Sequence, residues 1–128
     1  MNKMVLTDIK TWKDYFEGKH TNETTILETL LKENNIGVTG YTIAKILSDV
    51  KDKEIFEKLL KGFLVLPYVE IEKEDWIKAS KIVFEFRGLS IELGLLCALS
   101  QRKNLKILTK NKEVKKNKGV KIYEDEKE

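Results

Sequence analysis

The chain of 128 residues contains one cysteine, one proline and no long apolar run. A single cysteine excludes an internal disulfide, and because Cys97 lies in the apolar stretch 95–99 we expect a buried, unreactive thiol. No stretch approaches the ~20 apolar residues of a membrane-spanning helix, and the first residues lead directly into an expected strand rather than a secretion signal. We therefore expect a soluble, cytoplasmic protein with no membrane partner.

Charge of one sign is also scarce, because 24 basic residues face 21 acidic ones and the net charge is only +3. A field this weak neither requires nor excludes a nucleic-acid partner. The sequence has no Gly-rich phosphate loop, no Cys/His metal cluster and no Ser/His/Asp constellation, and its single histidine, His20, stands alone in a polar link. The length fits one domain, which we place at residues 1–123, followed by a charged tail at 124–128.

Short apolar segments alternate with stretches of helical spacing along the whole chain. This alternation is typical of an α/β protein with a parallel sheet covered on both faces by helices. We expect strands at residues 3–7, 36–39, 64–66, 106–108 and 120–122, and helices over residues 9–17, around 26–31, 43–50 and 55–63, and over 73–86 and 92–103.

Asp8 is the first candidate functional residue, because it directly follows the apolar segment at residues 4–7. In an α/β sheet the carboxyl ends of the strands are where ligands and metals usually bind. An isolated acid at such a place is either a metal ligand or the cap of the following helix, here one that contains Trp12, for which we favour a place in the core. The functional question is whether the chain supplies further acids.

Several segments in order resemble the PIN domain, and most closely the small toxin ribonucleases of the VapBC type. They are Val5-Leu6-Thr7-Asp8 followed by Trp12, Val38-Thr39-Gly40-Tyr41-Thr42-Ile43-Ala44, Leu64-Val65-Leu66-Pro67 before a helix containing Trp76, Gly88-Leu89-Ser90-Ile91, and Leu105-Lys106-Ile107-Leu108-Thr109-Lys110-Asn111. The resemblance implies a PIN-like three-layer α/β/α fold with a central, mostly parallel sheet of about five short strands. It also implies Mg²⁺ or Mn²⁺ held by clustered carboxylates, because hard divalent cations require oxygen ligands.

The departures from the family pattern weaken that site. Asp8 matches the first acid, but Lys45 stands at the second position, Leu93 at the third and Asn111 at the fourth. An ammonium near Asp8 opposes metal entry by several kcal/mol at an intermediate dielectric. We therefore interpret Asp8, Lys45, Leu93 and Asn111 as a vacated metal site, expect no cofactor, and hypothesise that Lys45 forms an ion pair with Asp8.

Glu92 carries the opposite interpretation, because it lies one position before Leu93. Neighbouring helical residues point about 100° apart, so we favour a first-turn acid stabilised by the helix dipole over one facing the pocket. If Glu92 does face the pocket, Asp8, Glu92 and Asn111 form the catalytic set of a Mg²⁺- or Mn²⁺-dependent ribonuclease, with Asp8 as a metal ligand. Thr7 and Thr109 would flank the pocket, either binding phosphate or capping strand ends.

The functional hypotheses therefore divide three ways. The first is a catalytically impaired relative of toxin ribonucleases that binds RNA or an antitoxin-like protein, and the second is the active nuclease. The third is a non-catalytic interaction module that forms a homodimer, with residues 43–50 and 55–63 as candidate dimer or antitoxin surfaces. The best nucleic-acid footprint is the basic run of Lys110, Lys112, Lys115, Lys116 and Lys118, for which a solvated surface is the alternative.

Overall fold

The structure, a computed structural model, describes residues 4–117 and 119–124 of the chain. The strands are β1 (Val5–Thr7), β2 (Val38–Thr39), β3 (Tyr68–Val69), β4 (Lys106–Leu108) and β5 (Lys121–Ile122). The helices are α1 (Ile9–Phe16), α2 (Asn22–Lys32), α3 (Gly40–Ser48), α4 (Lys53–Leu64), α5 (Lys73–Glu85) and α6 (Ile91–Lys103), with a short 3₁₀ helix, η1 (Lys112–Lys116). None of the helices among these residues has the length and apolar character needed to cross a membrane.

The strands form a small sheet in which every pairing is parallel. β4 lies between β1 and β5, and β2 pairs with β3. A parallel bridge between Val5 and Ile36 joins the two groups, with the Val5 N–H donating to the Asn35 carbonyl and the Gly37 N–H to the Val5 carbonyl, both at 2.9 Å. This confirms the expected parallel sheet of short strands and brings the carboxyl ends of β1 and β4 to one edge.

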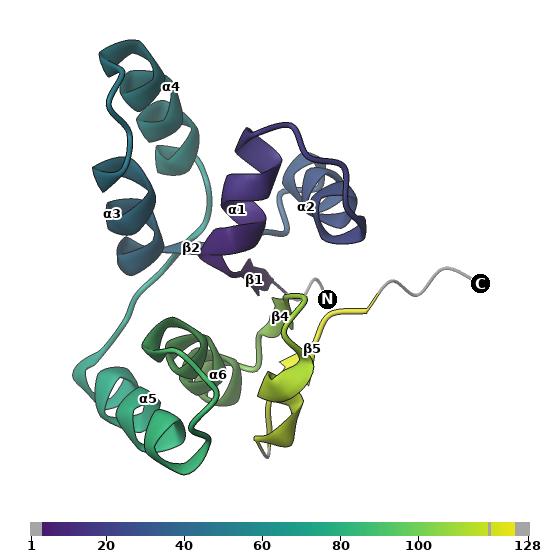
Figure 1. Ribbon diagram of the computed structural model, residues 1–128, viewed down its shortest axis with the longest axis vertical. Coiled ribbons are helices and arrows are strands. Elements are labelled where there is room, and N and C mark those ends of the chain that lie inside the picture. The colour runs from purple at the N-terminus through teal and green to yellow at the C-terminus, as the bar shows by residue number, and fades with distance from the viewer. Residues whose placement is uncertain (1–3, 118, 125–128) are drawn as a thin grey trace.

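Helices cover both faces of the sheet, as Figure 1 shows, with α1 to α4 on one side and α5 and α6 packed together on the other. The alternation of side chains along each strand explains the two layers. Val5 and Leu108 are buried with Trp12 against α1 to α4, whereas Leu6 and Ile107 are buried against α5 and α6. The expected three-layer α/β/α architecture and the place of Trp12 in the core are therefore confirmed.

Helix α6 contains the apolar stretch at residues 95–99. Every residue from 93 to 100 is buried, because α6 packs between the sheet and α5. Cys97 lies in this helix with no exposed surface, and burial raises the pKa of its thiol to about 12. The expectation of a buried cysteine is confirmed.

The third strand was predicted in the wrong place. Residues 64–66 are not a strand, because α4 continues to Leu64, and β3 follows Pro67 at Tyr68–Val69. Leu64 and Val65 are 70% and 78% exposed, whereas a central strand would bury them. A short apolar run does not distinguish a helix end from a strand by periodicity. Lys118 and residues 125–128 of the expected basic run and tail lie outside the described residues.

Candidate functional site

Asp8 lies at the carboxyl end of β1 and caps α1. Its Oδ1 accepts a hydrogen bond from the Thr11 N–H at 3.1 Å, and its Oδ2 accepts one from the Thr109 hydroxyl at 2.8 Å. Thr109 follows β4, and its side chain is fully buried. Asp8 is also buried, so two strands and one helix together fix its carboxylate at the edge of the sheet. Thr109 therefore contacts the Asp8 carboxylate directly and does not merely end a strand.

Glu92 reaches the same edge from the first turn of α6. Its Oε2 accepts the Ile9 N–H at 2.6 Å, a bond between residues that are 83 positions apart in the sequence. Burial raises the pKa of Glu92 above its ordinary value, the charge of Asp8 adds to this effect, and the Ile9 N–H and the charge of Lys45 oppose it. Glu92 is a first-turn acid of α6, as favoured from the sequence, but the preference against its facing the pocket is wrong, because its long side chain turns toward α1.

Asp8, Glu92 and Asn111 line one hollow with a volume of about 260 Å³, which we call the acid hollow. Asn111 is held by its own turn, since its Oδ1 accepts the Glu113 N–H at 3.0 Å and begins η1. The walls of the acid hollow carry more carboxylates than lysines. The four carboxylates are those of Asp8, Asp14, Glu23 and Glu92, and the two lysines are Lys10 and Lys110. Thr11, Leu93 and Asn111 complete the lining.

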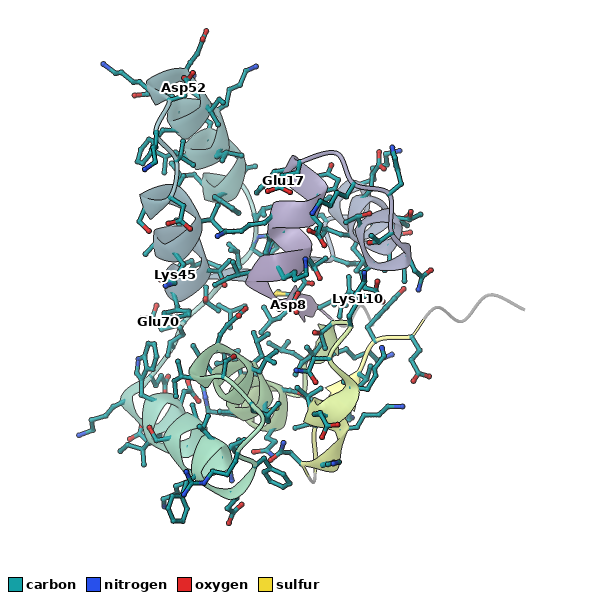
Figure 2. The ribbon with its side chains drawn as sticks, in the orientation of Figure 1. Asp8, Glu17, Lys45, Asp52, Glu70 and Lys110 are labelled. Atoms are coloured by element: carbon teal, nitrogen blue, oxygen red, sulfur yellow. The ribbon has the colours of Figure 1, made fainter. Side chains whose placement is uncertain are left out.

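Lys45 does not pair with Asp8. Among the described residues no ion pair within 4.0 Å joins the two, and Lys45 is exposed on α3. Figure 2 shows Lys45 on α3 and Asp8 at the start of α1. The predicted ion pair is wrong because the Asp8 oxygens already accept bonds from Thr11 and Thr109, while Lys45 extends into a neighbouring hollow beside Glu92.

Leu93 is 8% exposed and packs in the core with α5, although one side of it borders the acid hollow. It supplies an apolar wall where the family pattern has an acid. Within residues 4–117 and 119–124, no group of three or more His, Cys, Asp or Glu side chains is placed to hold a metal ion. The charges of Asp8 and Glu92 interact, and these two carboxylates and the Asn111 amide are groups of the acid hollow that could contact a cation. Of the other two wall carboxylates, Asp14 is paired with Lys10 and Lys19.

The lysines of the basic run differ in what they contact in the structure. Lys110 lines the acid hollow and lies beside Asp8 in Figure 2. The Lys112 ammonium donates to the Thr109 carbonyl at 3.1 Å. Lys115 and Lys116 form ion pairs with Glu124 at 3.2 Å and with Glu113 at 2.8 Å. Of these four lysines, only Lys110 reaches the site.

Four wall residues of the acid hollow were not anticipated from the sequence, namely Lys10, Thr11, Asp14 and Glu23. Asp14 is buried beneath Lys10 and Lys19, at 3.3 and 3.5 Å. Burial alone would raise the pKa of Asp14, but the hydrogen bonds and charges of Lys10 and Lys19 bring it below its ordinary value. The spacing of Lys10 and Asp14, one helical turn apart, was the available signal.

An apolar groove lies on the opposite side of α1, between α1, α2 and α4, with a volume of about 240 Å³. Its floor contains Trp12 and Phe63, whose rings meet edge to face at 5.4 Å. The Trp12 Nε1–H is buried, and no acceptor within the described residues pairs with it. The remaining lining residues are Tyr15, Phe16, Leu31, Lys58, Leu59, Gly62 and Leu66.

None of the protein-family models or curated protein sequences compared with the chain matches it. Solved structures do match. A toxin–antitoxin complex from Klebsiella pneumoniae contains a chain with a TM-score of 0.70 and 16% identity, and the match covers 94% of this chain and 99% of that one. VapBC2 from Rickettsia felis, bound to a DNA fragment from its promoter, gives a TM-score of 0.69 at 19% identity over 94% and 97% of the two chains.

FitAB bound to the IR36 DNA fragment gives a TM-score of 0.68 at 13% identity, over 94% of each chain. At these identities the similarity establishes the fold and not the activity. The structures that match have the PIN fold, so this chain has the PIN-type α/β fold. The resemblance inferred from the ordered segments of the sequence is confirmed at the level of the fold.

Proposed function

From this PIN-type fold, we propose that the protein is a toxin-related RNA-binding protein whose metal-dependent cleavage is impaired. The observation that carries the proposal is the partial acid set around Asp8. Asp8 and Glu92 interact, but Leu93 supplies an apolar wall and Lys45 brings a positive charge near Glu92. Two carboxylates already bonded to protein donors hold a divalent cation less tightly than the larger oxygen set that such cations prefer.

Binding and cleavage can be separated in one experiment. A labelled single-stranded RNA of mixed sequence is titrated with the protein in EDTA by fluorescence anisotropy, and the same RNA is then incubated with Mg²⁺ or Mn²⁺ and analysed on a gel. Binding in EDTA with no metal-dependent loss of RNA is the expected result. Absence of both binding and cleavage would overturn the proposal.

The second candidate is an active Mg²⁺- or Mn²⁺-dependent ribonuclease that uses Asp8, Glu92 and Asn111. The specific support is the turn of Glu92 toward Asp8, which places two carboxylates and an amide in one hollow whose walls carry more acids than lysines. Bound there, the metal would activate water and neutralise the phosphate. Metal-dependent cleavage that disappears in both Asp8→Asn and Glu92→Gln would establish this candidate in place of the first.

A gain of metal binding tests the vacated-site interpretation from the other direction. The double variant Lys45→Glu with Leu93→Asp supplies acids at both altered positions. We expect Leu93→Asp to lower the melting temperature, because Leu93 is buried, and Mn²⁺ to raise it again in the double variant but not in the wild-type protein. No Mn²⁺ effect in a folded double variant would mean that these positions do not face a common metal.

An antitoxin-like protein is the proposed macromolecular partner, because the structural neighbours are toxin–antitoxin complexes and the groove beside α4 exposes apolar surface. Gly62 lines the groove with open space around its Cβ position, so Gly62→Arg should block the groove without disturbing α4. Co-expression with the product of the adjacent gene should yield a complex that Gly62→Arg abolishes. Glu57→Arg, on the same helix but outside the groove, is the matched control that should retain it.

Self-association is proposed for the exposed apolar side chains of α4. Ile55 and Phe56 are 50% and 36% exposed, which supports residues 55–63 as a candidate contact surface. Sedimentation velocity across a range of concentrations measures the oligomeric state. A protein that stays monomeric at the highest concentration would remove the homodimer from the proposal.

A further inference from the structure

A second, larger hollow of about 460 Å³ lies between α1, α3 and the start of α6. Its walls carry four lysines, namely Lys10, Lys13, Lys19 and Lys45, against three carboxylates. The acid hollow has the opposite balance, with four carboxylates and two lysines. We call the larger one the lysine hollow, and its charge suits an anionic ligand rather than a cation.

Lys45 is the lysine of this hollow most available to a ligand. Lys10 and Lys19 pair with Asp14, and Lys13 pairs with Asp49 at 2.8 Å. Among the described residues Lys45 has no ion pair within 4.0 Å, and its influence on Glu92 and Asp49 is through charge alone. The surface ion pairs of the other lysines are individually weak, so an incoming phosphate can compete for those ammonium groups as well.

Exposed aromatic rings flank the lysine hollow. Tyr41 lines the hollow itself, and its ring meets that of Trp76 edge to face at 5.7 Å. Tyr68, which is 58% exposed, places its hydroxyl 2.8 Å from the position that a Cβ on Gly40 would occupy, next to Tyr41. Trp76 is 40% exposed. Rings from α3, β3 and α5 therefore gather beside one cationic wall.

The lysine hollow adjoins the acid hollow. Lys10, Asp14 and Glu92 line both of them. Figure 2 shows Lys45 on α3 and Asp8 at the start of the neighbouring helix α1. Glu92, in the wall that the two hollows share, therefore borders both the lysines and the hollow that contains Asp8.

We infer that the lysine hollow, with Tyr41, Tyr68 and Trp76, is the surface that holds a single-stranded RNA and leads it to Asp8. The inference rests on the proposed function and adds the route and the strandedness of its ligand. Phosphates match the lysines, and aromatic rings can stack only on bases that are not already paired in a duplex. This surface does not include Lys115 and Lys116, which line neither hollow.

The test compares two charge reversals on the full chain. Lys45→Glu changes the lysine hollow, and Lys81→Glu makes the same change at an exposed position of α5 that lines neither hollow. Affinity for a short single-stranded RNA is measured by anisotropy in EDTA at several salt concentrations. We expect Lys45→Glu to weaken binding about tenfold and to lower the salt slope by about one, and Lys81→Glu to stay within about twofold.

Tryptophan fluorescence gives an independent readout, because the chain contains only Trp12 and Trp76. Trp12 is buried, so quenching by RNA should come from Trp76 and should be absent in Trp76→Phe. Duplex RNA should quench the wild-type protein less than single-stranded RNA does.

The outcomes distinguish the two levels of the argument. If the wild-type protein binds RNA but Lys45→Glu and Lys81→Glu behave alike and Trp76 is not quenched, this inference is overturned while RNA binding stands. If the wild-type protein does not bind RNA, the proposed function fails, and the route fails with it. Quenching of Trp76 that depends on protein concentration without RNA would instead assign the surface to a second copy of the chain.

Discussion

Asp75 and Glu92 are carboxylates in the first turns of neighbouring helices, but the neighbouring charges that act on them most strongly are opposite in sign. The Arg102 guanidinium donates two hydrogen bonds of 2.8 Å to the Asp75 carboxylate, and the Glu72 N–H donates a third at 2.8 Å. Glu92 accepts the Ile9 N–H and lies near another acid, Asp8. The Arg102–Asp75 ion pair therefore joins α5 to α6. At the acid hollow, by contrast, Glu92 and Asp8 place two like charges near each other, an arrangement that is common at functional sites.

The pKa values express the same contrast. Burial alone would raise the pKa of Asp75, but the hydrogen bonds and charge of Arg102 and the Glu72 N–H bring it below its ordinary value. For Glu92 burial also raises the pKa, and Asp8 adds to the shift. Asp75 is therefore favoured as a charged group in the folded state, while folding makes the charge on Glu92 less favourable.

The largest effect on the free energy of unfolding is expected from Arg102→Ala, which removes the partner of Asp75. Asp75 has a side-chain exposure of 3%, so loss of its arginine leaves a buried carboxylate without its counter-charge. We expect the free energy of unfolding to fall by about 3 kcal/mol, measured by urea denaturation. Arg87→Ala is the control, because Arg87 is exposed and contacts the Phe84 ring, and its loss should cost under about 1 kcal/mol. Equal losses in the two variants would contradict a special role for the Arg102–Asp75 ion pair.

Thr109→Val tests how the acid hollow is held by neutral donors. It removes the hydroxyl that donates to Asp8 at 2.8 Å and that accepts the Asn111 N–H at 3.1 Å, with little change in shape. We expect a loss of about 1 to 2 kcal/mol in the same assay, because a buried oxygen of Asp8 loses its donor. Thr25→Val, on the exposed face of α2, is a matched change that should cost less. No loss in Thr109→Val would mean that solvent replaces the hydroxyl.

The pH dependence of unfolding sharpens the comparison. Because the pKa of Asp75 is lowered on folding, its stabilising contribution is complete above the ordinary value of 3.8 and is lost as the pH falls from there through the folded-state pKa. The free energy of unfolding should therefore decrease with falling pH in this window, and less steeply in Asp75→Asn. Identical slopes in the two proteins, measured by urea denaturation at each pH, would show that Asp75 is not the group responsible.

The smallest effect is expected from Glu92→Gln at neutral pH. The amide oxygen can still accept the Ile9 N–H, and the unfavourable charge near Asp8 is removed. The free energy of unfolding should stay the same or rise by less than about 1 kcal/mol. A loss similar to that of Arg102→Ala would place Glu92 with the structural carboxylates and end the contrast.

Local sequence patterns predicted most of the framework because they depend on near neighbours. The apolar segments became β1, β4 and β5, and the stop after α1 occurs at Gly18, which has a φ of 78° that suits glycine. The third strand failed because Leu64 and Val65 continue a helix, while the strand that pairs with β2 begins after Pro67. Strand pairing is a long-range property, and nothing local to residues 64–69 specifies it.

The order of the elements, the burial of Cys97 in the apolar stretch 95–99 and the place of Asp8 at a strand end follow from local sequence patterns. Which polar groups contact each other, by contrast, depends on how the helices and the sheet pack. Glu92 reaches Ile9 across 83 positions, Thr109 reaches Asp8 across 101, and Lys45 turns to a separate hollow. The direction of a long side chain depends on which donors surround it after the helices pack, and those donors come from distant parts of the chain.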